Sequence, residues 1–477
     1  MAAARRVVLF PSLGVGHLAP MLELAAVCIR HGLAVTVAVP DPATTAPAFS
    51  AALRKYASRL PSLSVHPLPP PPHPPASSGA DAAGHPLLRM LAVLRAHAPA
   101  LGDLLRGPHA ARALVADMFS VYALDVAAEL GVPGYLLFCT GATNLAVFLR
   151  LPRFCAGSSG SLRELGDAPV SFPGVRPLPA SHLPEEVLDR GTDISAAMLD
   201  AFDRMADARG ILVNTFDALE GPGVAALRDG RCLSNRATPP VYCVGPLITD
   251  GGAEEERHPC LAWLDAQPER SVVFLCFGSR GALSPEQVSE MATGLERSEQ
   301  RFLWALRAPA GTKPDAAMSL LPDGFLARTA DRGVVVTASW VPQVAVLQHA
   351  STGAFVTHCG WNSTLEAVAA GVPMVCWPLD AEQWMNKVFI VEEMKIGIEV
   401  RGYKPGALVQ ADIVDAILRR IMESDAQQGV LERVMAMKES AAAAWKEGGS
   451  SCTAFAEFLK DMEEGNVAMA HSNQVET

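Results

Sequence analysis

The sequence lacks three features that would place the protein on a nucleic acid, in a membrane or outside the cell. Its 477 residues carry a formal net charge of −11, whereas a nucleic-acid-binding surface needs a basic excess. No apolar run reaches the ~18–20 residues that a membrane-spanning helix requires. The ten cysteines show no paired spacing, which indicates reduced thiols. We therefore expect a cytoplasmic protein with no transmembrane segment and no nucleic-acid partner.

What the sequence does contain is a regular alternation of short apolar runs and helix-like segments. In the first half the apolar runs are 5–10, 33–39, 113–117, 134–138 and 210–216. In the second half they are 271–279, 301–306, 333–340, 353–360 and 372–378. Such alternation predicts parallel sheets with right-handed crossovers, and therefore an α/β protein with two doubly wound domains. Residues 244–259 read as the linker, and the proline-dense segment 67–86 as an extended loop.

A glycine-rich turn follows the first predicted strand. The residues "GVGHLA" at 14–19 fit the dinucleotide pattern G-x-G-x-x-A, and Asp41 follows the second strand at a suitable separation. This pattern indicates a nicotinamide- or flavin-dependent oxidoreductase. However, His17 places a bulky ring where a pyrophosphate would approach, and the same ring is a candidate base at the carboxyl edge of a sheet. Both interpretations are open at this point.

A second turn, in the segment "FVTHCGWNSTLEAVAAGVP" at 355–373, holds more polar side chains than a helix start needs. Ser363 and Glu366 have the spacing of a capping box, in which each side chain bonds a backbone N–H of the first turn. His358 and Asn362 are not explained by capping. A helix N-terminus also attracts anions, so these residues are candidate phosphate donors.

Residues 340–383, "WVPQVAVLQHASTGAFVTHCGWNSTLEAVAAGVPMVCWPLDAEQ", resemble the signature box of the plant family-1 UDP-sugar-dependent glycosyltransferases. The W-x-P-Q start, the H-C-G-W-N-S core and the E-Q end stand at that family's spacing. The resemblance extends over nearly the whole chain, including "GHLAPMLELA", "ILVNTFDALE" and "CFGSRGALS". It implies the GT-B fold, in which two Rossmann-like doubly wound domains face a cleft and a C-terminal helix crosses back to the N-terminal domain.

The resemblance also implies a division of the chain. Residues 1–245 would form the acceptor-binding domain and residues 246–450 the UDP-sugar-binding domain. Residues 451–465 would be the returning helix, and we expect a disordered tail at 466–477. The protein is expected to be a monomer.

The matching positions imply a role for individual side chains. Trp340 would stack on the uracil, and Glu366 would accept hydrogen bonds from the ribose. The implied UDP-binding residues are Ser279, Trp340, Val341, Gln343, His358, Asn362, Ser363 and Glu366. The implied sugar-binding residues are Thr140, Trp361, Glu382 and Gln383, and the expected acceptor-binding residues are Phe119, Phe148 and Asp380. No D-x-D pair is present, so we expect no metal and no cofactor besides the UDP-sugar co-substrate.

The catalytic residues implied by the resemblance are His17 as general base and Asp117 as its partner. A histidine has a pKa suited to accepting the proton of an attacking hydroxyl, and a carboxylate behind the ring orients it. Asp117 alternatively only caps the helix after it. The expected reaction is an inverting transfer of glucose, for which Gln383 is the family's usual residue, from UDP-glucose to a small phenolic or flavonoid-like acceptor. The oxidoreductase and a C-glycosylating variant of the family are the alternatives.

Overall fold

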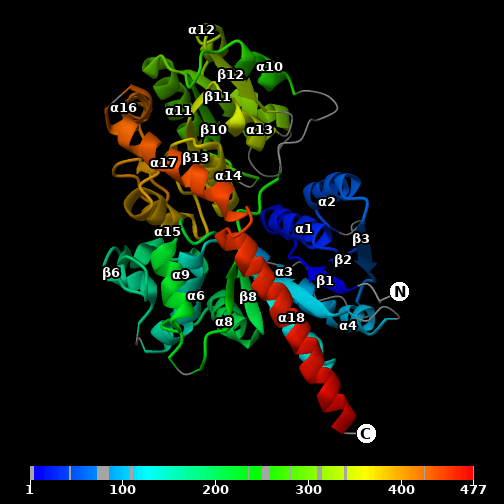
Figure 1. Cartoon of the computed structure of the whole chain (residues 1–477). Helices are drawn as coiled ribbons and strands as arrows, with labels where there is room; N and C mark the ends of the chain where they lie inside the picture. The colour runs from blue at the N-terminus through cyan, green and yellow to red at the C-terminus, as the bar shows by residue number, and fades with distance from the viewer. Residues whose placement is uncertain are drawn as a thin grey trace. The chain divides into compact units, whose positions relative to one another are not determined.

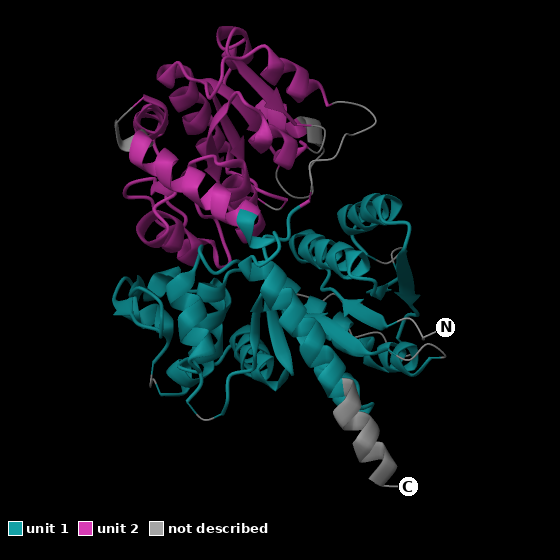
Figure 2. Ribbon diagram, viewed as in Figure 1, with its two compact units in different colours: residues 1–248, 443–477 teal, residues 249–442 magenta. Residues whose placement is uncertain are grey.

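The protein is described by a computed structural model. The described residues are 5–41, 45–71, 85–107, 111–157, 160–234, 236–249, 258–279, 281–308, 314–337, 341–423 and 425–475. The chain divides into two compact units, of which unit 1 comprises residues 1–248 and 443–477 and unit 2 comprises residues 249–442 (Figure 2). The predicted boundary at 245/246 lies close to this division. The tasks assigned to the two domains remain predictions.

Unit 1 is built on a parallel sheet with the strand order β3-β2-β1-β4-β5-β8-β9 (Figure 1). Its strands are β1 (Arg6–Phe10), β2 (Ala34–Pro40), β3 (Leu63–Leu68), β4 (Ala113–Asp117), β5 (Gly134–Phe138), β8 (Gly210–Val213) and β9 (Val241–Cys243). A small antiparallel pair joins β6 (Pro169–Val170) to β7 (Leu178–Pro179). The chain adds strands on one side up to β3 and then returns to place β4 beside β1. The pair β1–β4 is therefore the topological switch point, where open α/β sheets place their ligands.

The helices of unit 1 connect these strands. They are α1 (Val15–Arg30), α2 (Pro47–Arg59), α3 (Pro86–Ala96), α4 (Ala98–Arg106), α5 (Ala123–Glu129), α6 (Ala142–Ala156), α7 (Glu185–Leu188), α8 (Asp193–Arg204), α9 (Gly221–Arg228) and α18 (Ser450–Val475). The sequence analysis did not predict β3, and it placed the start of the proline-dense loop at residue 67. Pro67 instead pairs with β2 inside β3. A proline fits there because β3 is an edge strand, where one side needs no hydrogen-bond donor.

Unit 2 repeats the plan with a parallel sheet of order β12-β11-β10-β13-β14-β15. Its strands are β10 (Val272–Cys276), β11 (Arg301–Ala305), β12 (Gly333–Val336), β13 (Thr352–Thr357), β14 (Met374–Cys376) and β15 (Gly397–Glu399). Its helices are α10 (Pro259–Asp265), α11 (Pro285–Ser298), α12 (Phe325–Arg328), α13 (Gln343–Gln348), α14 (Trp361–Ala370), α15 (Gln383–Val388), α16 (Ala411–Glu423) and α17 (Asp425–Ala444), which ends in unit 1. Here the switch point is the pair β10–β13.

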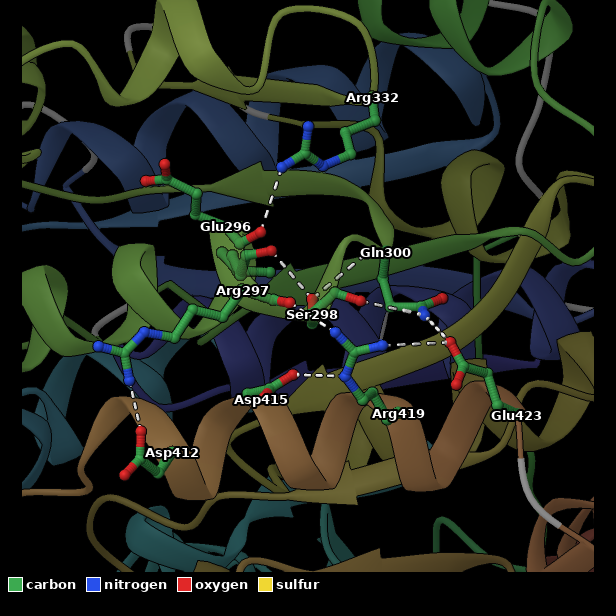
Figure 3. A network of polar contacts seen from close by, with 10 residues as sticks. Glu296, Arg297, Ser298, Gln300, Arg332, Asp412, Asp415, Arg419 and Glu423 are labelled. Atoms are coloured by element: carbon green, nitrogen blue, oxygen red, sulfur yellow. Dashed lines mark hydrogen bonds and ion pairs between the residues drawn. The ribbon is translucent and has the colours of Figure 1, made fainter.

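A polar network ties the end of α11 to its neighbours in unit 2 (Figure 3). The last carbonyl groups of a helix have no partner within the helix, and a nearby cation is favourable there. Arg332 donates to the carbonyl oxygen of Glu296 at 3.2 Å, and Arg419 donates to that of Arg297 at 2.6 Å. Since Arg419 belongs to α16, its bond helps to fix the packing of α16 against α11.

The C-terminal helix α18 packs on unit 1, as the expected GT-B fold requires. Phe455 and Phe458 are buried in the core of that unit, beside the edge strand β9. Asp461 accepts a hydrogen bond of 2.6 Å from the hydroxyl of Tyr135 and one of 2.9 Å from Arg209. The helix continues past residue 465 to Val475, and the expected disorder at 466–477 stays a prediction. Within the described ranges, no helix has both the length and the apolar character needed to cross a membrane.

Candidate active site

The predicted catalytic pair lies at the switch point of unit 1. His17 is in the first turn of α1, directly after β1, and Asp117 is the last residue of β4. Nδ1 of His17 lies 2.8 Å from Oδ2 of Asp117. The carboxylate is fully buried, whereas 26% of the His17 side chain is exposed. The ring therefore has one nitrogen held by an acid inside the fold, and its outer part reaches solvent.

Two further donors hold the Asp117 carboxylate. The backbone N–H of Phe119 donates to Oδ1 at 2.9 Å, and the Cys139 thiol donates to Oδ2 at 3.2 Å. Burial by itself would raise the pKa of Asp117, but the His17 ring and these donors lower it below its usual value. Asp117 thus caps the short helical turn after it and also pairs with His17. The residue is both a helix cap and the partner of the histidine. The sequence analysis missed Cys139.

The same cluster was tested as a metal site. The ligand atoms of His17, Asp117 and Cys139 all lie within 4.8 Å of one another. Two ligands of a tetrahedral zinc ion lie about 3.3 Å or more apart, because each is ~2.0–2.3 Å from the metal. The separation of 2.8 Å between His17 and Asp117 is too short for this arrangement. The distances fit a hydrogen-bonded network, in which Asp117 is the common acceptor.

The turn between β5 and α6 is fixed by a buried carboxylate. Glu220, which is 1% exposed, accepts hydrogen bonds from the N–H groups of Ala142 at 2.8 Å and Thr143 at 3.0 Å. Its pKa is raised by burial, although these donors oppose the shift. The predicted sugar residue Thr140 is buried in this turn, and its hydroxyl accepts a 2.7 Å hydrogen bond from Asn144. The hydroxyl proton of Thr140 is therefore left to donate to another group.

The His17 ring lies against the first glycine of the "GVGHLA" turn, where its Cδ2 would be 3.3 Å from a Cβ added at Gly14. The dinucleotide fingerprint uses that glycine for the tight turn and the second one, here Gly16, for the close approach of the pyrophosphate. The ring on Gly14 therefore leaves the dinucleotide interpretation open at this point.

In unit 2, His358 lies just after β13 at the switch point with β10. Its ring is packed against the backbone of Gly278 and Gly360, and a Cβ on either glycine would collide with Nε2. Burial lowers the pKa of His358 to about 4, although the nearby Asp380 opposes the shift. The ring is therefore neutral at neutral pH. Ser279, which follows β10, is exposed.

The start of α14 differs from the predicted capping box. The helix begins at Trp361 with Gly360 as its N-cap, so Ser363 is already inside the first turn and cannot cap it. Instead, Nε2 of Gln343 donates to the Ser363 hydroxyl at 2.8 Å and to the Glu366 carboxylate at 2.6 Å. Burial raises the pKa of Glu366 to about 7, although the bond from Gln343 opposes the shift. Gln343, Ser363 and Glu366 form one hydrogen-bonded group beside the glycine N-cap.

Comparisons with known proteins agree with this arrangement. The family described as UDP-glucoronosyl and UDP-glucosyl transferase matches residues 242–430. The anthocyanidin 5,3-O-glucosyltransferase of Rosa hybrid cultivar is 38% identical over 474 residues, covering 95% of this chain and 98% of that protein. This chain belongs to the plant UDP-glycosyltransferase family. The enzyme is therefore a UDP-glycosyltransferase, as the signature box predicts.

Solved structures of similar proteins establish the fold of this glycosyltransferase as GT-B. Phytolacca americana UGT2, complexed with UDP-2fluoro-glucose and pterostilbene, has a TM-score of 0.85 and 33% identity, covering 96% of this chain and 100% of that one. A UDP-glucosyltransferase from Polygonum tinctorium capable of glucosylating indoxyl, in complex with 3,4-dichloroaniline, has a TM-score of 0.87 and 36% identity. It covers 97% of this chain and 100% of that chain.

The loop that ends the signature box of this glycosyltransferase is held by Gln383. Its Oε1 accepts from the N–H groups of Leu379 at 2.9 Å and Asp380 at 3.0 Å, and its Nε2 donates to the Asp380 carboxylate at 2.6 Å. Glu382 is half-buried and is the N-cap residue of α15. Its carboxylate accepts a hydrogen bond of 3.4 Å from Asn386. Gln383 thus has a structural role within this loop. The same side chain is predicted to contact the sugar.

The other predicted residues of the enzyme occupy more varied positions. Trp361 is buried and Asn362 is half-buried in the first turn of α14, and Val341 is buried just before α13. Trp340 lies outside the described residues. Phe119 contacts the His17 ring, with ring centroids 5.1 Å apart.

Phe148, a predicted acceptor wall, lies in the core of unit 1. It is 4% exposed, and its ring is stacked on Phe202 at a centroid distance of 4.2 Å and packs edge-on against Phe138. Packing of α6 against α8 and β5 accounts for this residue. Its contact with an acceptor stays a prediction.

Proposed function

We propose that this UDP-glycosyltransferase moves glucose from UDP-glucose to a hydroxyl of a small phenolic, flavonoid-like acceptor with inversion at the anomeric carbon. The observation that carries the proposal is the bond between His17 and Asp117, because it combines a fully buried acid with a partly exposed ring. This is the arrangement that a general base needs, with one nitrogen held by the acid and part of the ring exposed.

The proposed mechanism uses the two nitrogens of His17 differently. Nδ1–H donates to Asp117, which leaves the lone pair of Nε2 to accept the proton of the acceptor hydroxyl. As that oxygen attacks the anomeric carbon, the bond from this carbon to the UDP oxygen breaks and UDP departs. The negative charge of Asp117 stabilises the imidazolium that forms. A single displacement from the side opposite UDP inverts the anomeric configuration.

The donor is proposed to bind unit 2 at the start of α14. A helix N-terminus favours an anion, and Gly360 lets a phosphate approach without a side chain in the way. Within the described part of the chain, Nδ1 of His358 is buried without a hydrogen-bond partner, and a neutral ring can donate there to a phosphate oxygen. Ser279 adds a hydroxyl, and Glu366 would accept from the ribose. We propose that these donors hold the diphosphate without a metal ion and stabilise the departing UDP.

The sugar and the acceptor are assigned more indirectly. The names of the similar proteins include glucosyltransferases, an anthocyanidin and the phenol pterostilbene, which supports glucose as donor and a phenolic acceptor. Of the four polar hydrogen-bonding positions on the Gln383 amide, three are used inside the loop. We therefore expect Gln383 to select glucose mainly by holding the loop, together with Glu382 and Thr140.

The test is a screen of UDP-glucose, UDP-galactose, UDP-xylose and UDP-glucuronate against phenolic acceptors, with mass detection of products. In the His17→Ala variant, kcat should fall by roughly 10²–10⁴-fold, the range for loss of a positioned base. Its affinity for UDP in calorimetry should remain unchanged, since unit 2 holds the nucleotide. A variant that keeps its turnover and loses UDP binding would make His17 a nucleotide ligand. An acid-stable product would indicate the C-glycosylating alternative.

A further inference from the structure

Cys139 is a buried thiol whose hydrogen bond the proposed mechanism does not use. It follows β5 directly and is 6% exposed. Its Sγ lies 3.2 Å from Oδ2 of Asp117, the same oxygen that accepts from Nδ1 of His17. The carboxylate therefore has three donors, with the ring and the thiol on one oxygen and the N–H of Phe119 on the other.

The sheet and the turn after it fix this position of the thiol. In the parallel pair β4–β5, Asp117 is opposite Leu137, and Cys139 comes two residues later. Cys139 packs in the same core cluster as Leu137, and its thiol reaches the carboxylate at the end of β4. The turn that follows is anchored by Glu220 through the first N–H groups of α6. The strand before Cys139 and the turn after it therefore both fix the position of its thiol.

Three donors on one carboxylate have a consequence for the ring. A carboxylate whose lone pairs are already used is a poor proton acceptor, because hydrogen bonds to its charged form favour that form. The proton between His17 and Asp117 therefore stays on Nδ1. This keeps the lone pair on Nε2, which is the nitrogen that must accept the proton of the acceptor hydroxyl.

We propose that Cys139 is a positioning residue of the catalytic pair. Its thiol keeps Asp117 ionised and oriented so that His17 presents Nε2 as the base. This inference rests on the proposed function, because it assigns Cys139 a part in the proton transfer by His17.

The test compares Cys139→Ala with Cys139→Ser, which have similar size but differ in the hydroxyl that replaces the thiol donor. We expect kcat of the alanine variant to fall about tenfold, the effect of losing one hydrogen bond to a charged group at the weak end of its range. The serine variant should stay within about threefold of the parent enzyme. KM for the UDP-sugar should be unchanged in both, and the NMR signal of the His17 Nδ1 proton should be retained in the serine variant and shift or broaden in the alanine variant.

The controls separate this role from packing and from the proposed function. Cys232→Ala removes another buried thiol of unit 1 and should leave kcat unchanged. Equal losses in the alanine and serine variants, or no loss in either, would overturn the role of Cys139 while His17→Ala still lacks activity. If His17→Ala keeps its turnover, the proposed base is wrong, whatever the Cys139 variants do. Thermal unfolding of each variant shows whether it is folded.

Discussion

Helices α6 and α14 begin in the same way, one in each unit, and differ in what covers their first N–H groups. Each starts after a parallel strand and three connecting residues, with a glycine in an extended conformation as N-cap, Gly141 or Gly360. In unit 1 the buried carboxylate of Glu220 accepts from the first two N–H groups of α6. In unit 2 the N-cap of α14 supplies no side chain. The same strand–glycine–helix arrangement thus holds an internal carboxyl group in one unit and suits an external anion in the other.

The comparison also separates two kinds of site. The Asp117 carboxylate in unit 1 already has its three donors, so the His17 base is oriented before any substrate arrives. In unit 2 the buried Nδ1 of His358 and the glycine N-cap have chemistry that a phosphate would complete. Preorganisation suits a base because its geometry must be right at the moment of reaction, whereas a binding site gains affinity from groups that the ligand satisfies.

The substitution with the largest expected effect disrupts the preorganised pair of His17 and Asp117 in unit 1. Asp117→Asn removes the charge and puts an amide beside Nδ1 of His17, which favours the wrong tautomer. We expect kcat to fall by roughly 10²–10⁴-fold in steady-state assays, with UDP affinity unchanged in calorimetry. The Asp41→Asn variant, in the residue that the dinucleotide interpretation uses, should keep full activity. Weaker UDP binding in Asp117→Asn would contradict the separation of the two sites.

Removing the internal carboxyl group that caps α6 would make this helix resemble α14. Glu220→Ala leaves two buried N–H groups without their acceptor, so we expect the free energy of unfolding to fall by about 2–4 kcal/mol in denaturant titrations. The exposed Glu129 in the same unit is the matched control, and its alanine variant should change stability by less than about 0.5 kcal/mol. Equal stability of the two variants would show that Glu220 is not needed as the cap.

Displacing the His358 ring with a side chain at Gly360 should weaken nucleotide binding. The Cβ of Gly360→Ala would collide with the His358 ring, and overpacking of this kind costs about 1–3 kcal/mol. We expect UDP affinity in calorimetry to fall about 10–100-fold. Gly221→Ala, at the start of α9 where an added Cβ meets nothing within 4 Å, should bind UDP normally. An unchanged affinity of Gly360→Ala would place the diphosphate elsewhere.

A smaller effect should appear in the pH dependence of UDP binding. Glu366 has its pKa raised by burial to about 7, and its ionised form is the better acceptor for ribose hydroxyls. Binding therefore favours the deprotonated carboxylate, and affinity should rise by up to about tenfold between pH 6 and pH 8. Glu366→Gln does not titrate and should flatten this rise, apart from the titration of UDP itself. Identical pH profiles for the two proteins would exclude Glu366 as the cause.

The smallest expected effect is that of metal removal. If N–H and side-chain donors in unit 2 hold the diphosphate, EDTA should change the initial rate by less than about twofold. Loss of turnover in chelator that Mg²⁺ or Mn²⁺ restores would show a metal requirement and would disprove this part of the proposal.

The sequence anticipated those parts of the site that local patterns encode. The alternation of apolar runs predicted both parallel sheets, and the family resemblance assigned the catalytic roles to His17 and Asp117, which the structure brings together. The edge strand β3 was missed because its sequence LSVHPL contains no unbroken apolar run and includes Pro67. The capping box was wrong because its spacing does not show where the helix starts, and Gly360 starts it before Ser363.

The sequence by itself determined the elements, the glycines of the turns and the family to which the chain belongs, since each depends on residues close together in the chain. Only the tertiary structure showed that Cys139 completes the bonds of Asp117 and that Glu220 caps α6. Cys139 is 22 residues from Asp117 in the chain, and Glu220 is 78 residues from Ala142. Their contacts follow from the strand order and register of the parallel sheet, because these decide which strand ends lie side by side. No local pattern of residue types carries that information.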